Sequence, residues 1–170
     1  MLLWPARIFL LINLILHVST ASWLTIENRK ARGQQYSFKD TVQASYASRT
    51  MMMSGGIVFV FIVYHLLHFT FGITNPGLFH LHDAKGRIDV YTMVVSSYQN
   101  LGISAVYVVA MALLCMHLSH GLSSLFQSLG LSHAKFRTGI SLFSKGMALL
   151  IFVGNSSIPV AVLLRILHVA

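Results

Sequence analysis

Nine histidines stand against only four acidic residues in this 170-residue chain, and several of the histidines lie inside long apolar runs. An imidazole within a membrane needs a polar partner, because an unpaired polar group in hydrocarbon is costly. Imidazole is also a ligand of haem iron, and two neutral imidazoles from different helices can face each other across the metal. The histidines therefore fit two kinds of chemistry, hydrogen bonding between helices or haem ligation.

Expected depth separates His65 from His17 and His120. His17 lies about seven residues, or about 10 Å, before the end of the first apolar run, and His120 lies about six residues before the end of the third. Both ends face the same side of the membrane, so the two imidazoles are expected at nearly one level. His65 lies about 14 residues, or roughly 20 Å, from that side. We therefore expect His17 and His120 to share one haem, and His65 to lie nearer the opposite surface.

The other histidines have simpler interpretations. His68 and His117 are each three residues from another histidine, and one helix cannot supply both axial ligands, so hydrogen bonds or contacts with haem propionates are expected. Solvated or interfacial side chains are expected at His80, His82, His133 and His168. Small residues that permit close approach of a flat macrocycle or of a neighbouring helix are Gly55, Gly56, Gly102, Gly121, Ser123 and Ser124.

Four apolar stretches are long enough to position these side chains across a bilayer. They lie near residues 3–24, 51–73, 99–126 and 138–168, and crossing a hydrocarbon core of about 30 Å takes about 20 helical residues. Lipid permits only helices or closed barrels, and the alternating pattern of barrel strands is missing. The sequence predicts an all-α integral membrane helical bundle, with residues 1–170 forming a single transmembrane haem-binding domain.

The first stretch has a second interpretation. Arg7, the apolar run after it and the small residues at 19–22 also resemble a secretory signal peptide. Asn13 and His17 fit poorly in such a segment, and Trp23 is a suitable interfacial aromatic residue. A retained helix is therefore the expected state.

Basic residues predict the orientation of the bundle. The connections on one side carry Arg29, Lys30, Arg32, Lys39, Arg49, Lys135 and Arg137, whereas the connection on the other side carries only Lys85 and Arg87. Positive charge favours the cytoplasm, so loops 25–50 and 127–137 are expected inside and the turn-rich loop 74–98 outside. The expected location is the bacterial inner membrane.

Composition excludes other classes of protein. The chain is 55% hydrophobic and only 9% charged, which is far from the balance of a soluble domain. Its net charge of +8 comes mainly from the ends of apolar runs and not from a patch interleaved with aromatic residues, so no nucleic-acid partner is expected. Cys115 is the one cysteine, so the chain alone builds neither a disulfide framework nor a cysteine-ligated metal centre.

Four segments resemble the cytochrome b (b558-type) membrane-anchor subunit of succinate dehydrogenases and fumarate reductases, in its five-helix, two-haem branch. They are HVSTASWLTIENRKARGQQY from His17, SRTMMMSGGIVFVFIVYHLLHF from Ser48, DVYTMVVSSYQNLGISAVYVVAMALLCMHLSHGLSSLFQSLGL from Asp89, and GNSSIPVAVLLRIL from Gly154. Together they cover nearly the whole chain. The SRTM, YHLLHF and HLSHG…FQSLG pieces are specific in combination.

The resemblance implies axial haem ligands. His17 matches the ligand on the family's second helix, His65 the ligand on the third and His120 the ligand on the fourth. The family's first helix, with its own histidine, has no counterpart here. His65 then lacks its expected partner, so we expect one haem from this chain alone and two if a separate polypeptide supplies that helix. Leu118 stands where some relatives carry an acidic residue, which disfavours transmembrane proton transfer by that route.

The resemblance also implies a function. We expect a non-catalytic, quinone-reactive subunit of a succinate:quinone oxidoreductase of the respiratory chain and tricarboxylic acid cycle, in which haem b relays electrons between an iron–sulfur subunit and menaquinone or another quinone. A flavoprotein subunit would carry the dicarboxylate chemistry. Two alternatives stay open: a haem b anchor for another dehydrogenase, such as a hydrogenase or formate dehydrogenase, and a histidine-lined transporter or channel subunit without haem.

Overall fold

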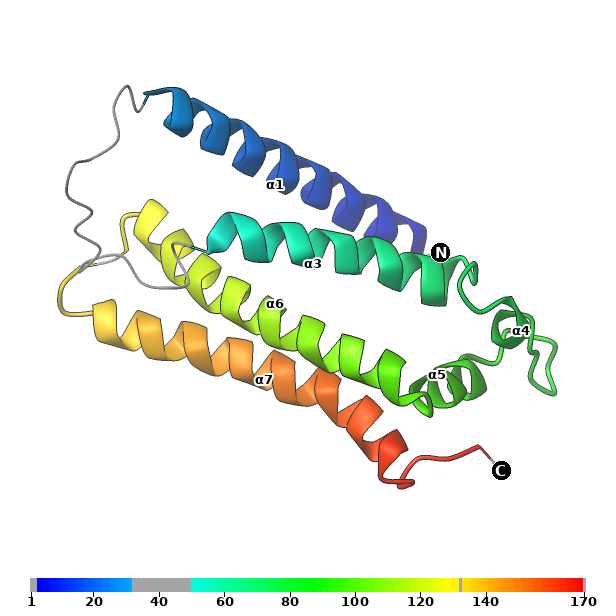
Figure 1. Ribbon diagram of the computed structural model, residues 1–170. Coiled ribbons are helices and arrows are strands. Elements are labelled where there is room, and N and C mark those ends of the chain that lie inside the picture. Colours follow the sequence, from blue (N-terminus) through cyan, green and yellow to red (C-terminus); the bar gives the residue numbers. More distant parts are fainter. Residues whose placement is uncertain (1–2, 32–49, 132, 170) are drawn as a thin grey trace. The chain divides into compact units, whose positions relative to one another are not determined.

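The computed structural model of the chain describes residues 3–31, 50–131 and 133–169 (Figure 1). Its elements are α1 (Leu3–Ala31), α3 (Met51–His65), the π-helical turn η1 (Leu66–Thr70), α4 (Pro76–Phe79), α5 (Val90–Tyr98), α6 (Leu101–Ser128) and α7 (Arg137–Leu163). The described residues contain no β-strand, only an isolated bridge between His82 and Ile88. The predicted all-α fold class is confirmed.

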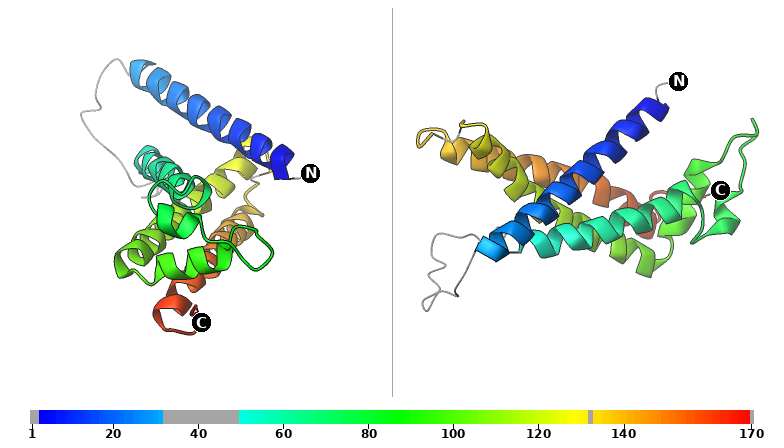
Figure 2. Two further views of the ribbon diagram at one scale, coloured as in Figure 1. Left: turned by 90° about the vertical axis from the view of Figure 1, so that its right-hand side faces the viewer. Right: turned by 90° about the horizontal axis from the view of Figure 1, so that it is seen from above.

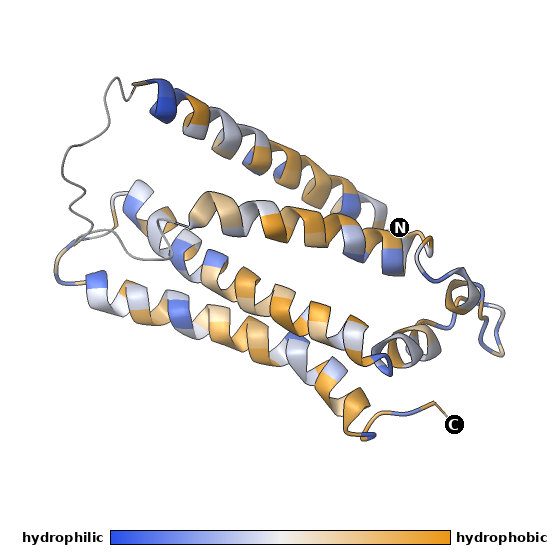
Figure 3. Cartoon of the chain, in the orientation of Figure 1, coloured by the Kyte–Doolittle hydropathy of each residue, from blue (hydrophilic) through white to orange (hydrophobic). Residues whose placement is uncertain are grey.

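Four helical segments are long and apolar enough to cross a membrane. They are Leu3–Ala31, Met51–Thr70, Leu101–Ser128 and Arg137–Leu163, each at least as long as the roughly 20 residues that a hydrocarbon core requires. Figure 3 shows apolar residues through the middle of these helices. The chain is therefore a multi-pass membrane protein.

Residues 1–43 and 44–170 form two separate units. In the first unit, Pro5 fits the first turn of α1, where backbone N–H groups need no helical acceptor. The helix runs to Ala31, beyond the expected boundary at residue 24, and Lys30 pairs with Glu27 at 3.0 Å on its last turns. Glu27 therefore lies in a helix and not in the expected loop 25–50. A polar segment that leaves the bilayer can stay helical in water. Basic residues in the last turn also suit the negative end of the helix dipole.

In the second unit, α6 packs against both α3 and α7 (Figure 1). Tyr107, near the start of α6, contacts Phe61 late in α3, and Gly121, near the end of α6, lies beside Met51 at the start of α3. The two helices are therefore antiparallel. Val162, late in α7, shares a buried core with Tyr107, so α7 is antiparallel to α6 as well. The views in Figure 2 show these helices crossing at an angle.

The connection between α3 and α6, expected as the turn-rich loop 74–98, contains the helices α4 and α5 beside its turns. Asp83 accepts hydrogen bonds from the backbone N–H groups of Lys85 and Arg87, and its other oxygen receives the Arg87 guanidinium at 2.7 and 2.9 Å. The backbone N–H of Arg87 and its guanidinium hold the pKa of Asp83 below its ordinary value. Asp89 then caps α5 by accepting from the backbone N–H of Thr92 at 3.0 Å.

Candidate functional site

Four histidines of the second unit lie in two groups, one around Tyr107 where α3 and η1 meet α6, and one further along α6. We call His65, His68 and Tyr107 the outer cluster, and His117 with His120 the inner cluster. Tyr107 and His117 are ten residues apart on the continuous helix α6, which corresponds to about 15 Å along the helix axis. The two clusters therefore occupy different levels of the membrane.

The outer cluster is held together by the phenol of Tyr107. The Tyr107 hydroxyl lies 3.1 Å from Nδ1 of His68 and 3.5 Å from Nδ1 of His65. A phenol has one proton, so it can donate to one imidazole and accept from the other. The His68 ring is only 2% exposed, and its Nε2 is buried without a hydrogen-bond partner among the described residues. Tyr107 therefore provides the one hydrogen bond seen for a buried imidazole.

Aromatic rings surround this polar contact. Phe69 stacks on the His68 ring with centroids 4.1 Å apart, and Phe61 meets Tyr107 edge-on at 5.0 Å. Tyr98 also packs edge-on against Tyr107, at 5.1 Å. Burial raises the pKa of Tyr98, which lies just outside the spans, to about 12. These rings exclude water, which strengthens the hydrogen bond to His68.

The backbone changes its geometry at the outer cluster. Directly after His65, α3 continues as the π-helical turn η1, and the backbone N–H of Phe71 donates to the carbonyl of Leu66 at 2.9 Å. A π-helical turn holds more residues than an α-helical turn, and this changes the direction of the side chains within it, His68 included. Single π-turns inside helices occur often at functional sites.

The inner cluster contains one histidine that faces α3 and one bonded within its own helix. Nδ1 of His117 lies 3.2 Å from the Ser54 hydroxyl. A Cβ at Gly55 would lie 3.1 Å from Cε1 of His117, so this glycine leaves room for the ring. His120 makes its hydrogen bond to Ser124, one turn further along α6, with 3.3 Å between Nε2 and the hydroxyl.

The three predicted haem ligands lie on three different helices. His17 is in α1, which belongs to the first unit. His65 is the last residue of α3 and exposed, and His120 is a half-buried residue of α6. Tyr107, which touches His65, is thirteen residues from His120 on α6, or about 20 Å along the axis. The structure thus keeps His65 and His120 apart.

Histidines expected to form hydrogen bonds do so. His68 bonds to Tyr107, and His117 bonds to Ser54. The remaining histidines of the second unit are exposed: His80, His82, His133 and His168. Tyr107 was not singled out from the sequence, because a lone tyrosine in an apolar helix has the pattern of an ordinary core residue; only the antiparallel pairing of α3 and α6 brings it to the two imidazoles.

Metal-binding side chains do not gather in groups of three or more in the part of the chain that the structure describes. No group of three or more histidine, cysteine, aspartate or glutamate side chains there could hold a metal ion. A haem site of the predicted kind needs only two imidazoles from the protein, since the macrocycle supplies the other four ligands.

The basic residues expected to face the cytoplasm are only partly described. Arg29 and Lys30 lie in the last turn of α1. Arg32, Lys39 and Arg49 lie outside the described residues.

Comparison of the chain with protein-family models, with curated proteins and with solved structures finds no match.

Proposed function

We propose that this chain is the membrane-anchor cytochrome b subunit of a succinate dehydrogenase or fumarate reductase complex, relaying electrons between an iron–sulfur subunit and menaquinone or another quinone. One observation carries the proposal. His120 is a half-buried imidazole within a membrane span, and the hydrogen bond that it makes among the described residues stays inside its own helix. An ionisable side chain in such a place is a candidate functional group.

The chemistry of His120 fits an axial haem ligand. Its one partner among the described residues, Ser124, is a hydroxyl one turn away at 3.3 Å, and a hydroxyl can rotate to release the nitrogen. The neighbouring Gly121 has no side chain, and a Cβ there would meet only Met51, at an ordinary 3.7 Å. We propose His17 as the opposite ligand, on the basis of its depth in the sequence. Haem b held there would supply one-electron transfer, while the protein supplies ligands, orientation and a low dielectric.

His65 belongs to a second haem in this proposal. At its level in the second unit, His68 shares the same helical segment, is buried and bonds to Tyr107. His68 is therefore unsuited to be the opposite ligand. A further helix carrying a histidine would complete a site with His65.

The partners follow from the same proposal. Basic residues at the end of α1, Arg29 and Lys30, would face the cytoplasm and help dock the iron–sulfur subunit, with the flavoprotein subunit beyond it. Residues 25–50 and 127–137 would be cytoplasmic and residues 74–98 outside, in the inner membrane of a bacterium. Catalysis on the dicarboxylate would take place in the flavoprotein.

Purification of the tagged chain from its native membrane tests the proposal. We expect a low-spin b-type absorbance spectrum, together with a co-purifying flavoprotein and an iron–sulfur protein. A b-type spectrum with subunits of a hydrogenase or formate dehydrogenase would favour another dehydrogenase. A chain without haem would contradict the proposal and favour a transporter or channel subunit. A Lys145→Gln variant, changed at an exposed residue of α7, should give the same spectrum and the same co-purifying subunits as the wild type. It therefore controls for losses of haem or subunits during purification.

A further inference from the structure

The end of α7 is built differently from two other helix ends in the chain. Residues with positive φ follow η1 and α6, and both are glycines: Gly72 at 66° and Gly130 at 74°. After α7 the corresponding residue is Arg165, at 59°, the one non-glycine residue with positive φ in the part of the chain described. A side chain makes this conformation costly, and glycine adopts it freely. Arg165 therefore holds a backbone conformation that glycine would adopt at lower cost.

Hydrogen bonds fix the backbone around Arg165. Its N–H donates to the carbonyl of Val162 at 3.0 Å, and the N–H of Ile166 donates to Ala161 at 2.9 Å, which is the usual pattern for a helix end with a left-handed residue. The following segment returns toward α5, where the Tyr91 hydroxyl donates to the carbonyl of His168 at 3.1 Å. Arg165 and His168 are thus held on a defined turn.

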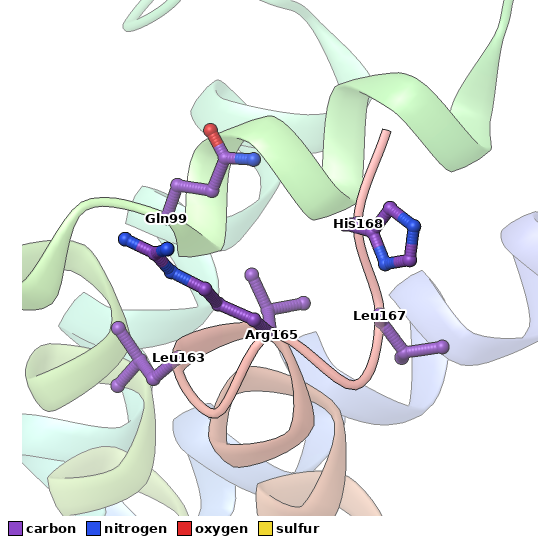
Figure 4. A pocket seen from close by; sticks show the side chains of 6 residues that line it. Gln99, Leu163, Arg165, Leu167 and His168 are labelled. Carbon is purple, nitrogen blue, oxygen red and sulfur yellow. The ribbon is translucent and has the colours of Figure 1, made fainter. Parts of the chain in front are cut away.

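This turn borders a cavity of about 600 Å³ that is open to the surface. Its lining residues are Gln99, Val162, Leu163, Arg165, Leu167 and His168 (Figure 4). In Figure 4 the Arg165 side chain extends on the side of Gln99 and Leu163, and His168 lies on the side of Leu167. The wall thus combines three apolar side chains with three that can donate hydrogen bonds.

No described carboxylate forms an ion pair with the Arg165 guanidinium. The ion pairs among the described residues are Lys30 with Glu27 and Arg87 with Asp83, and neither involves Arg165. No acidic side chain lines the cavity. The cavity therefore has a net positive charge and an unmatched set of donors in a planar fork, which fits the oxygens of a phosphate.

The position of the cavity at the end of α7 indicates which class of phosphate compound fits it best. Helix α7 has 27 residues and is therefore about 40 Å long, which exceeds the hydrocarbon core of about 30 Å. Because the helix is longer than the core, a cavity at its end can reach the level of the lipid headgroups. No phenylalanine, tyrosine or tryptophan lines it, so it offers no large aromatic ring on which a flat ligand could stack. Its apolar wall of Val162, Leu163 and Leu167 fits the first carbons of acyl chains.

We infer that this cavity binds the phosphate of an anionic phospholipid, with Arg165 as the main anchor and Gln99 and His168 as further donors. This inference does not depend on haem binding. A simpler role for Arg165 would be to offset the negative end of the α7 dipole. That role needs a positive charge alone, and it predicts the same behaviour for lysine and arginine.

Four variants of the full chain in detergent test the inference: Arg165→Gly, Arg165→Gln, Arg165→Lys and, as a control cation on the connection next to α5, Lys85→Gln. Each is titrated with short-chain phosphatidylglycerol, and bound lipid is counted by native mass spectrometry. Arg165→Gly and Arg165→Gln should lose affinity by about tenfold or more, Arg165→Lys by a few-fold, and Lys85→Gln should bind like the wild type. Without lipid, Arg165→Gly should unfold at an equal or higher temperature than the wild type, because glycine relieves the strain.

Two comparisons identify the ligand. Short-chain phosphatidylcholine should bind more weakly than phosphatidylglycerol, since its choline adds a positive charge, and inorganic phosphate should compete poorly because it lacks acyl chains. Equal binding of the two lipids, or tight competition by inorganic phosphate, would overturn the assignment to an anionic lipid. Unchanged phosphatidylglycerol binding by a folded Arg165→Gly variant would overturn the site itself.

Discussion

Removing the Tyr107 hydroxyl should destabilise the second unit through one buried hydrogen bond. Tyr107→Phe keeps the ring that packs against Phe61 and Tyr98, so no cavity forms. It leaves His68, which is 2% exposed, with neither ring nitrogen bonded to a described residue. An unpaired buried polar group costs about 1–3 kcal/mol, and hydrogen bonds between membrane helices average about 0.6 and reach about 1.7 kcal/mol. We therefore expect a loss of about 1–2 kcal/mol, with little from the 3.5 Å contact to His65.

The assay is reversible unfolding in mixed micelles, followed by far-ultraviolet circular dichroism. Tyr98→Phe is the matched control, because Tyr98 is also buried in the same aromatic group and its hydroxyl makes no hydrogen bond to another described residue. Its free energy of unfolding should change by less than about 0.5 kcal/mol. In a His68→Leu background, Tyr107→Phe should cost little. Equal losses for Tyr107→Phe and Tyr98→Phe, or the same loss without His68, would refute the hydrogen bond as the cause.

Two further predictions concern the connection between α3 and α6. Gly72→Ala should destabilise the chain by about 1–2 kcal/mol, because φ is +66° and a Cβ would overlap the Phe79 ring, whereas Gly56→Ala, where a Cβ meets nothing, should raise the thermal midpoint slightly. The folded pKa of Asp83 lies below its ordinary value of 3.8, so its stabilisation is present above that pH and disappears as the pH falls further. Hydrogen exchange at Lys85 and Arg87, corrected for intrinsic rates, should accelerate there, and Asp83→Asn should remove this dependence.

The number and type of the spans could be predicted because apolar length alone decides them. Their ends depended on local features that hydropathy does not report. The segment around Glu27 and Lys30 is polar, yet it continues helix α1 and carries an ion pair between these two residues. Helix α7 stops at Leu163, before the expected residue 168, because Arg165 adopts a left-handed conformation. The pattern of apolar residues reports neither the polar extension of α1 nor the left-handed conformation of Arg165.

The candidate site, too, could be predicted from the sequence only in part. Depth along each helix predicted that His65 and His120 lie at different levels, since 1.5 Å per residue is fixed by helix geometry. Tyr107 could not be found in this way, because its role arises only when two helices distant in sequence pack together. The π-helical turn after His65 depends on the same packing. Partners across an interface therefore need the structure, whereas levels within a helix do not.

Haem stoichiometry tests the central claim most directly. The purified full chain is titrated with haem b, and bound haem is measured by the pyridine haemochrome and by the low-spin absorbance spectrum. We predict one six-coordinate haem per chain, lost in His17→Ala and in His120→Ala, and kept in His133→Ala, where the residue is exposed between two helices. Adding a helical peptide that carries a histidine should raise the content to two through His65. A full low-spin spectrum in both His17→Ala and His120→Ala, or no haem binding by the wild type, would contradict the account.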